Sequence, residues 1–132
     1  MNNNKNKDNT HSSHTPNQIE NKNLTSRYIN VGTINIRGLN DINKQHNLIN
    51  ECMQYNLDIV AIQETHFNNP NCKYIYKDNP HYQAFWSHDP TSSFSGVGLI
   101  ISKNLAIHIN KTESYKGQII FADFLFKGKQ QL

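Results

Sequence analysis

The chain has 132 residues, of which 36% are hydrophobic and 17% charged, with 13 Lys and Arg against 10 Asp and Glu. This length suits one compact domain, while the low charged fraction and the two cysteines exclude a coiled coil and a disulfide-rich secreted scaffold. No apolar run approaches the roughly 20 residues that span a bilayer, and the N-terminus lacks an apolar signal stretch. We therefore expect an intracellular protein, nuclear or cytoplasmic, with no membrane partner.

Residues 1–27 differ in composition from the rest of the chain. They are rich in Asn, Lys, Ser, Thr, His and Gln and contain few apolar side chains. Such a segment cannot bury enough apolar area to offset its ordering entropy, so we expect a disordered Asn-rich tail. Residues 28–132 carry nine basic and eight acidic residues. Because this part is nearly neutral, any contact with nucleic acid must be argued from specific residues rather than from overall charge.

The first ordered part of the chain predicts a strand, a helix and a second strand. Residues 28–36 are rich in β-branched side chains and partly alternate, which is typical of a strand. A helix follows, with Asp41 or Asn43 as its N-cap and an end near Asn56. Residues 57–62 form a continuous apolar run of the kind found in strands buried on both faces. This succession predicts two parallel strands covered by the helix.

The remainder of the chain predicts antiparallel sheet. The expected strands are residues 82–86, 96–101, 106–109 and 119–126. A tight turn is expected at residues 127–129, and the strand after it would begin where the chain stops. We therefore expect the last strand to lack its hairpin partner, which would leave an apolar edge exposed.

The cysteines and histidines do not predict a metal centre. Cys52 and Cys72 are expected to be free thiols, because an intracellular setting disfavours a disulfide. A zinc set of His66, Cys72, His81 and His88 is disfavoured, because no two of these residues have the spacing that places two ligands on one turn.

Polar residues follow the first two predicted strands where each strand ends. Asn35 and Arg37 end the first strand, and Gln63, Glu64 and His66 follow the second. Neighbouring parallel strands bring Asn35 and Glu64 to the same edge of the sheet, where α/β proteins bind ligands. A carboxylate beside a carboxamide offers oxygen ligands that suit Mg²⁺. The residues alone leave open a plainer interpretation, in which Asn35 makes a turn hydrogen bond and Glu64 is a solvated strand-end residue.

The same segments resemble a known family. The motifs are TINIRGLN at 33–40, LDIVAIQETHF at 57–67 and SGVGLIIS at 95–102. In this order and spacing they are similar to the N-terminal half of the endonuclease/exonuclease/phosphatase superfamily, which has the DNase I-like fold. The form QETH, with FWS at 85–87 and GQIIFADFLFKGK at 117–129, is most similar to the apurinic-type endonuclease domain of non-LTR (LINE-like) retrotransposons. The resemblance covers residues 28–132.

The resemblance implies an α/β (α+β) fold, a truncated part of a four-layered αββα sandwich, and metal-dependent phosphodiester hydrolysis with DNA as partner. The implied cofactor is Mg²⁺, with Mn²⁺ as an alternative. Glu64 would hold the metal and Asn35 would help position it, which makes these the two implied catalytic residues. Arg37 and His66 would contact substrate phosphate. The glycines of residues 96–98 are expected to be structural, because glycine lets backbones approach closely.

The chain also departs from the family pattern. Arg37 stands where several relatives have an acidic or amide residue, and Gln118 replaces a frequent Arg. The family's Tyr on the next strand, its Asp-x-Asn motif and its late Asp-His pair are not in this chain. We therefore expect a fragment of a DNA-nicking endonuclease that is inactive alone, with the missing C-terminal half of the domain and a reverse transcriptase domain as partners. The alternatives are a non-catalytic remnant or binding module of the same fold and, less favoured, a phosphatase or sphingomyelinase.

Overall fold

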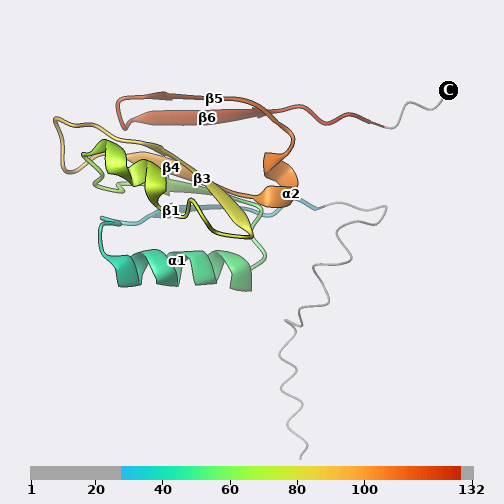
Figure 1. The fold of residues 1–132 in the computed structure, drawn as a ribbon, viewed down its shortest axis with the longest axis horizontal. Coiled ribbons are helices and arrows are strands. Elements are labelled where there is room, and N and C mark those ends of the chain that lie inside the picture. The colour runs from blue at the N-terminus through green and yellow to red at the C-terminus, as the bar shows by residue number, and fades with distance from the viewer. Residues whose placement is uncertain (1–27, 129–132) are drawn as a thin grey trace, which may run out of the picture.

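The computed structural model describes residues 28–128, which form a mixed α+β structure with two sheets and few helices (Figure 1). The predicted disordered tail, residues 1–27, and residues 129–132 lie outside the described residues. The elements in chain order are β1 (Val31–Asn35), α1 (Ile42–Gln54), β2 (Ile59–Gln63), η3 (Pro70–Tyr74), β3 (Tyr82–Ser87), β4 (Val97–Ser102), α2 (Lys103–Ala106), β5 (Ile109–Tyr115) and β6 (Ile119–Phe124).

Four strands form the first sheet, in the order β1-β2-β4-β3, and β5 and β6 form a separate hairpin. Strands β1 and β2 are parallel, with Asn35 opposite Gln63, which confirms the predicted strand–helix–strand unit. Strand β4 runs antiparallel to both β2 and β3, so Val97 also lies opposite Gln63. The carboxyl ends of β1 and β2 and the start of β4 therefore meet at one end of the sheet.

Helix α1 begins and ends where its capping residues predict. The Asp41 side chain is the N-cap and accepts a hydrogen bond from the backbone N–H of Lys44 at 2.9 Å, which satisfies one of the free amides of the first turn. After the C-cap at Tyr55, Asn56 takes a φ of 51°, a left-handed conformation that Asn tolerates.

The elements stack in three layers, with α1 on one face of the four-stranded sheet and the β5–β6 hairpin on the other (Figure 1). The core lies between α1 and the sheet, where the buried side chains include Leu48, Cys52, Val60, Ile62 and Ile100. Burial alternates along β2, with Val60 and Ile62 buried and Ile59 and Ala61 half-buried, so this strand is less enclosed than its continuous apolar run predicts. No helix within residues 28–128 has both the length and the apolar character needed to cross a membrane.

One prediction about the last strands is corrected. Residues 103–106 form the short helix α2, and strand β5 begins only at Ile109, so the strand expected at residues 106–109 is wrong. Lys, Leu and Ala favour helix, and the backbone N–H of His108 donates to the carbonyl of Leu105 at 2.9 Å, which tightens the end of this turn. Strand β6 pairs with the preceding strand β5 along its length, and the segment after the predicted turn at residues 127–129 lies outside the described residues.

Candidate metal and phosphate site

The segments that follow β1 and β2 continue side by side beyond the ends of the strands. The backbone N–H of Ile36 donates to the carbonyl of Gln63 at 3.0 Å, and that of Gly38 donates to the carbonyl of Glu64 at 2.7 Å. A further bond of 2.8 Å joins the N–H of Leu39 to the carbonyl of Thr65. These bonds extend the parallel pairing of β1 and β2. The segment that carries Asn35 and Arg37 therefore lies directly beside the segment that carries Glu64 and His66.

Three of the four predicted site residues have a left-handed backbone. The φ angles are 51° at Arg37, 53° at Glu64 and 61° at His66. Such conformations are uncommon for residues other than glycine and cost on the order of 1–3 kcal/mol each, and they cluster at functional sites. The cross-strand hydrogen bonds hold these residues in place, so the surrounding fold imposes a conformation that the residues themselves do not prefer.

A third segment, the loop before β4, closes on the same region. The backbone N–H of Thr65 donates to the carbonyl of Gly96 at 3.1 Å, and that of His66 donates to the carbonyl of Ser95 at 2.8 Å. Gly96 has a φ of 108°, and a Cβ at this position would collide with the hydroxyl of the fully buried Thr65. This close approach agrees with the structural role that we expected for Gly96.

The turn of the β5–β6 hairpin is tied to this loop by Gly117. Its carbonyl accepts a hydrogen bond from the N–H of Gly96 at 2.9 Å. Its N–H donates to the hydroxyl of the buried Ser87 at 2.9 Å. The second sheet is therefore anchored at the end of the first sheet where the predicted site residues lie.

Asn35 and Glu64 differ in how their side chains are held. The Asn35 side chain is exposed, and its Oδ1 accepts a hydrogen bond from the backbone N–H of Arg37 at 3.2 Å. This is the turn bond that the plainer interpretation anticipates, and it leaves one lone pair of Oδ1 unused. Glu64 is half-buried, and its carboxylate makes no hydrogen bond or ion pair within residues 28–128. The geometry thus provides a carboxylate and an amide oxygen on adjacent segments.

Lys44 is a neighbour of the site that sequence reasoning missed. Its Nζ donates to the carbonyl of Ile36 at 2.6 Å and lies 3.4 Å from the carbonyl of Arg37. Lys44 thereby fixes the turn that carries Arg37 and adds a second positive charge near it. Nothing in the sequence marks this lysine, because its role depends on how α1 packs beneath the end of β1.

Phe94 is the second neighbour that was missed. Its ring contacts His66 edge to face at a centroid distance of 5.9 Å, and it is 77% exposed. The His66 ring lies over Gly38, where a Cβ would stand 3.1 Å from Nδ1. A single aromatic residue in a Ser-rich loop is the signal that could have drawn attention to Phe94.

Side chains that commonly bind metals do not gather elsewhere in the described structure. Within residues 28–128 no three His, Cys, Asp or Glu side chains are arranged to hold a metal ion. Cys52 and Cys72 are buried free thiols, and the Cys72 Sγ lies 3.9 Å from Nδ1 of His88. Burial raises the pKa of the Cys72 thiol, so it is a poor zinc ligand and a poor nucleophile at neutral pH.

The chemistry available at the site is that of phosphate and hard cations. A carboxylate and an amide can coordinate a hydrated divalent ion, and a guanidinium and an imidazole can contact phosphate oxygens. No protein-family model matches the chain, and no curated protein matches it.

Proposed function

We propose that residues 28–128 are part of a DNase I-like domain of the endonuclease/exonuclease/phosphatase superfamily, of the type found in non-LTR retrotransposons, and that the site binds Mg²⁺ and DNA phosphate. The observation that carries the proposal is the backbone pairing of residues 35–39 with residues 63–66. This pairing places Asn35 and Arg37 beside Glu64 and His66, as the motif resemblance implies. The strained backbone of three of these four residues supports a functional role.

The layer order supports the proposed fold. The described residues supply a helix layer, a four-stranded sheet and a second sheet, in that order. The face of the hairpin that points away from the first sheet carries apolar side chains, with Ile119 58% and Phe121 40% exposed. Exposed apolar area of this kind suits a further layer packed on the hairpin, which is the fourth layer of an αββα sandwich.

Glu64 is the residue that would hold the metal. Mg²⁺ in proteins is bound by one or two carboxylates and keeps several waters or phosphate oxygens, so a single carboxylate without a competing partner in the described chain meets the minimum requirement. Asn35 can add its amide oxygen. When bound, Mg²⁺ supplies charge that polarises a phosphoryl oxygen. Mn²⁺ fits the same oxygen ligands.

Arg37 and His66 are the residues that would contact the substrate. The exposed guanidinium of Arg37 presents planar donors that match a phosphate group, and its turn is held by Lys44. The imidazole of His66 can donate to a phosphate oxygen from the neighbouring segment. Phe94, exposed beside His66, adds an aromatic face that a nucleotide base can contact.

We further propose that the chain alone does not complete hydrolysis. The site offers one carboxylate, and within residues 28–128 no three His, Cys, Asp or Glu side chains are arranged to hold a metal ion. Each missing general acid or base costs about 10²–10⁴ in rate. DNA nicking would then require groups from a further part of such a domain. A non-catalytic binding module of the same fold is the second candidate, favoured by a site that offers a single carboxylate.

The metal proposal is tested by titrating Mn²⁺ into the ¹⁵N-labelled chain. Paramagnetic broadening should appear first at the amides of residues 35–39 and 63–66. It should disappear in Glu64→Gln and persist in Glu51→Gln, which removes an exposed carboxylate from α1. Broadening that is unchanged in Glu64→Gln would remove the proposed metal site.

The catalytic proposal is tested with supercoiled plasmid and Mg²⁺. The chain alone should not nick the plasmid, and fusion to the C-terminal half of a DNase I-like endonuclease should produce nicking. In the fusion, Asn35→Ala and Glu64→Gln should each lower the rate by about 10²-fold or more. Nicking by the chain alone that Glu64→Ala abolishes would show that it is a complete enzyme. Absence of nicking in the fusion, with Mn²⁺ binding retained, would favour the binding module.

A further inference from the structure

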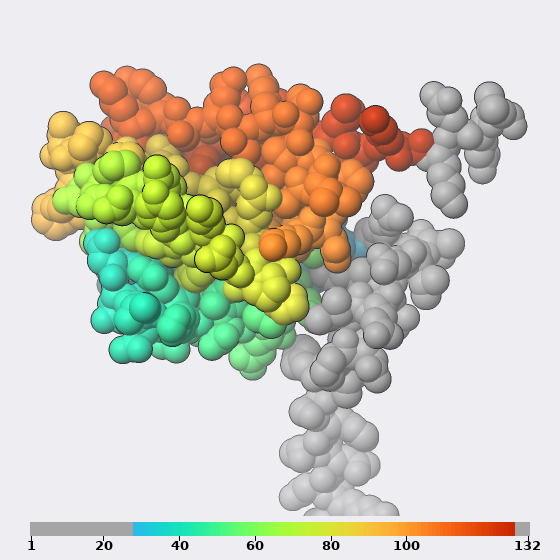
Figure 2. Space-filling model, in the orientation of Figure 1, coloured from blue at the N-terminus to red at the C-terminus, as the bar shows by residue number. Residues whose placement is uncertain are grey.

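An open hollow of about 590 Å³ lies at the opposite end of the first sheet from the Glu64 site. Its position follows from the register, because Tyr82 pairs with Ser102 at the end of β4 where Ile59 begins β2. The surface belongs to η3 and the residues just after it, to β3 and to α2, which face the viewer in Figure 2. Its lining includes Lys73, Tyr74, Tyr76, Lys77, Tyr82 and Lys103.

The charge of this hollow differs from that of the described chain as a whole. Residues 28–128 contain eight Lys and Arg and eight Asp and Glu, so they are neutral overall. Three of those cations, Lys73, Lys77 and Lys103, line the hollow, and no acidic residue lines it. Asp78 follows Lys77 in the chain and is exposed, but it is not part of the lining. The hollow is therefore a local positive surface on a neutral body, which suits an anionic ligand.

Aromatic rings form the second part of this surface. Tyr74 is 55% exposed, and the Nζ atoms of Lys73 and Lys77 lie 5.0 Å and 5.3 Å from its ring centroid. The hydroxyl groups of Tyr76 and Tyr82 point toward helix α1. The Tyr76 hydroxyl donates to the carbonyl of Gln45 at 2.5 Å, and the Tyr82 hydroxyl lies 2.9 Å from the carbonyl of Cys52. Their rings thus line the hollow with apolar area, while the exposed Tyr74 ring has the two lysine ammonium groups over it, which move aside when a base stacks there.

The edge of β3 is less suited to a peptide. Strand β3 is the last strand of its sheet, and an acidic peptide could in principle pair with its free backbone. The η3 segment lies against this strand, and the indole N–H of Trp86 donates to the carbonyl of Ile75 at 3.3 Å. Because η3 covers part of the edge, a ligand must be held mainly by the lysine and tyrosine side chains. Phosphates and bases alternate along a nucleic acid strand, which matches cations placed around an exposed ring.

We propose that the hollow formed by η3, β3 and α2 binds single-stranded nucleic acid, with Lys73, Lys77 and Lys103 contacting phosphates and Tyr74 stacking on a base. Binding here needs no metal and does not involve Glu64. The length of β3, roughly 20 Å for six residues, suits a few nucleotides. If the chain also binds DNA phosphate at the Glu64 site, that site and the hollow would contact different parts of one strand.

The test measures fluorescence anisotropy of a labelled oligothymidylate of about twelve nucleotides with the full chain in EDTA. The triple variant Lys73→Gln, Lys77→Gln, Lys103→Gln should weaken binding at least tenfold. It should also lower the slope of log affinity against log salt by about 2, since each single-strand phosphate contact contributes about 0.7. The control is the triple variant Lys111→Gln, Lys116→Gln, Lys127→Gln, which removes the same charge from outside the hollow and should change affinity less than threefold.

Tyr74 separates stacking from charge. Tyr74→Ala should weaken binding about fivefold or more with an unchanged salt slope, and Tyr74→Phe should retain it. Glu64→Gln should not change the affinity for oligothymidylate. This test therefore stays valid even if Glu64 proves not to bind a metal ion. Equal losses in the two triple variants, or no measurable binding by the unmodified chain, would overturn the proposal. Competition by polyglutamate as effective as that by unlabelled oligothymidylate would show an acidic-peptide surface instead.

Discussion

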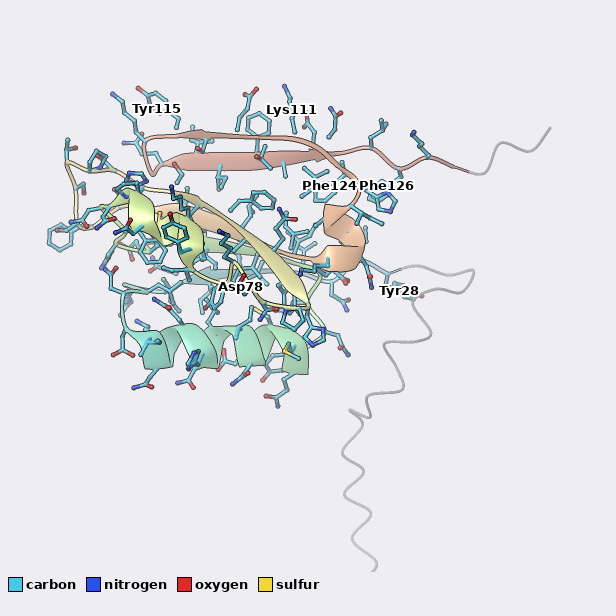
Figure 3. All side chains as sticks on the ribbon, in the orientation of Figure 1. Tyr28, Asp78, Lys111, Tyr115, Phe124 and Phe126 are labelled. Atoms are coloured by element: carbon cyan, nitrogen blue, oxygen red, sulfur yellow. The ribbon has the colours of Figure 1, made fainter. Side chains whose placement is uncertain are left out.

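The four-stranded sheet and the β5–β6 hairpin both contain apolar strands, β2 and β4 in the sheet and β6 in the hairpin, but they differ in what covers them. On β2 and β4, Val60, Ile62 and Ile100 are at most 3% exposed, because α1 packs on that face of the sheet. On β6, Ile119 and Phe121 are 58% and 40% exposed. The hairpin is covered on one face only: Phe124 points toward the first sheet, while Lys111 and Tyr115 point away from it (Figure 3).

This difference shows how the hairpin depends on its attachment. An isolated two-stranded hairpin is marginally stable in water, so β5 and β6 need the first sheet more than the first sheet needs them. The attachment consists of the inward face of β6, with half-buried Ile120, Ala122 and Phe124, and the two hydrogen bonds of Gly117. We therefore expect mutations in the two regions to differ in how much they lower the free energy of unfolding and in how many strands they affect.

The largest expected effect is a truncation in the core of the first sheet. Ile100→Ala should lower the free energy of unfolding by about 2–5 kcal/mol, because the removed methyl groups are fully buried and leave a cavity. Ile119→Ala on the outer face of the hairpin should change it by about 0.5 kcal/mol or less. Urea unfolding followed by circular dichroism measures both values. Equal losses would show that the hairpin's outer face is buried in solution.

The attachment itself can be weakened at Ser87. Ser87→Ala removes the hydroxyl that accepts the hydrogen bond from the N–H of Gly117, and leaving this donor without a partner costs about 1–3 kcal/mol. Hydrogen exchange should accelerate in β5 and β6 and change little in β2. Ser93→Ala, in the exposed loop nearby, is the control. Uniform acceleration across both sheets would instead indicate that the two regions unfold as one unit.

Alkaline pH should destabilise the first region selectively. Burial, followed by the nearby Glu51, raises the pKa of the Cys52 thiol from 9.0 to about 11. Burial also raises the pKa values of Tyr76 and Tyr82 above their ordinary value of 10.0. These groups ionise more readily in the unfolded chain, so the stability they contribute is present below pH 9 and is lost as the pH rises. The loss is at most about 1.4 kcal/mol per pH unit for each group.

This pH dependence is measured by urea unfolding at several pH values from neutral to alkaline. Cys52→Ala should reduce the slope between pH 9 and 11, where the unfolded thiol ionises and the folded thiol stays protonated. Cys72→Ala removes the other free thiol, whose pKa is also raised by burial. The pH slope of this variant is compared with that of Cys52→Ala. A slope in Cys52→Ala identical to that of the unmodified chain would contradict the assignment.

The smallest expected effect concerns the strained end of the first sheet. Arg37 has a φ of 51°, so Arg37→Gly should be about 1 kcal/mol more stable than Arg37→Ala, which keeps a Cβ in the same backbone. Both variants lose the guanidinium and should lose phosphate binding alike. Thermal unfolding separates them. Identical stabilities would show that the backbone at residue 37 is relaxed in solution.

Local sequence patterns determined much of the first region. Asp41 and Asn56 mark the ends of α1 because capping and left-handed residues act within one turn of the helix. The apolar runs located β1, β2, β3 and β4, and their order placed Asn35 and Glu64 at the same end of the sheet. The helix ends follow from contacts between residues close in the chain. The shared position of Asn35 and Glu64 follows from the rule that a strand–helix–strand unit has parallel strands.

Only the tertiary structure decided the rest, because the interactions concerned join residues far apart in the chain. The bonds of Gly117 to the loop before β4 and to Ser87 leave no local pattern. The same holds for the hollow that joins Lys73 and Lys77 to Lys103. Residues 28–128, which are neutral by composition, acquire a positive surface only when folding gathers these lysines and leaves the acidic residues elsewhere.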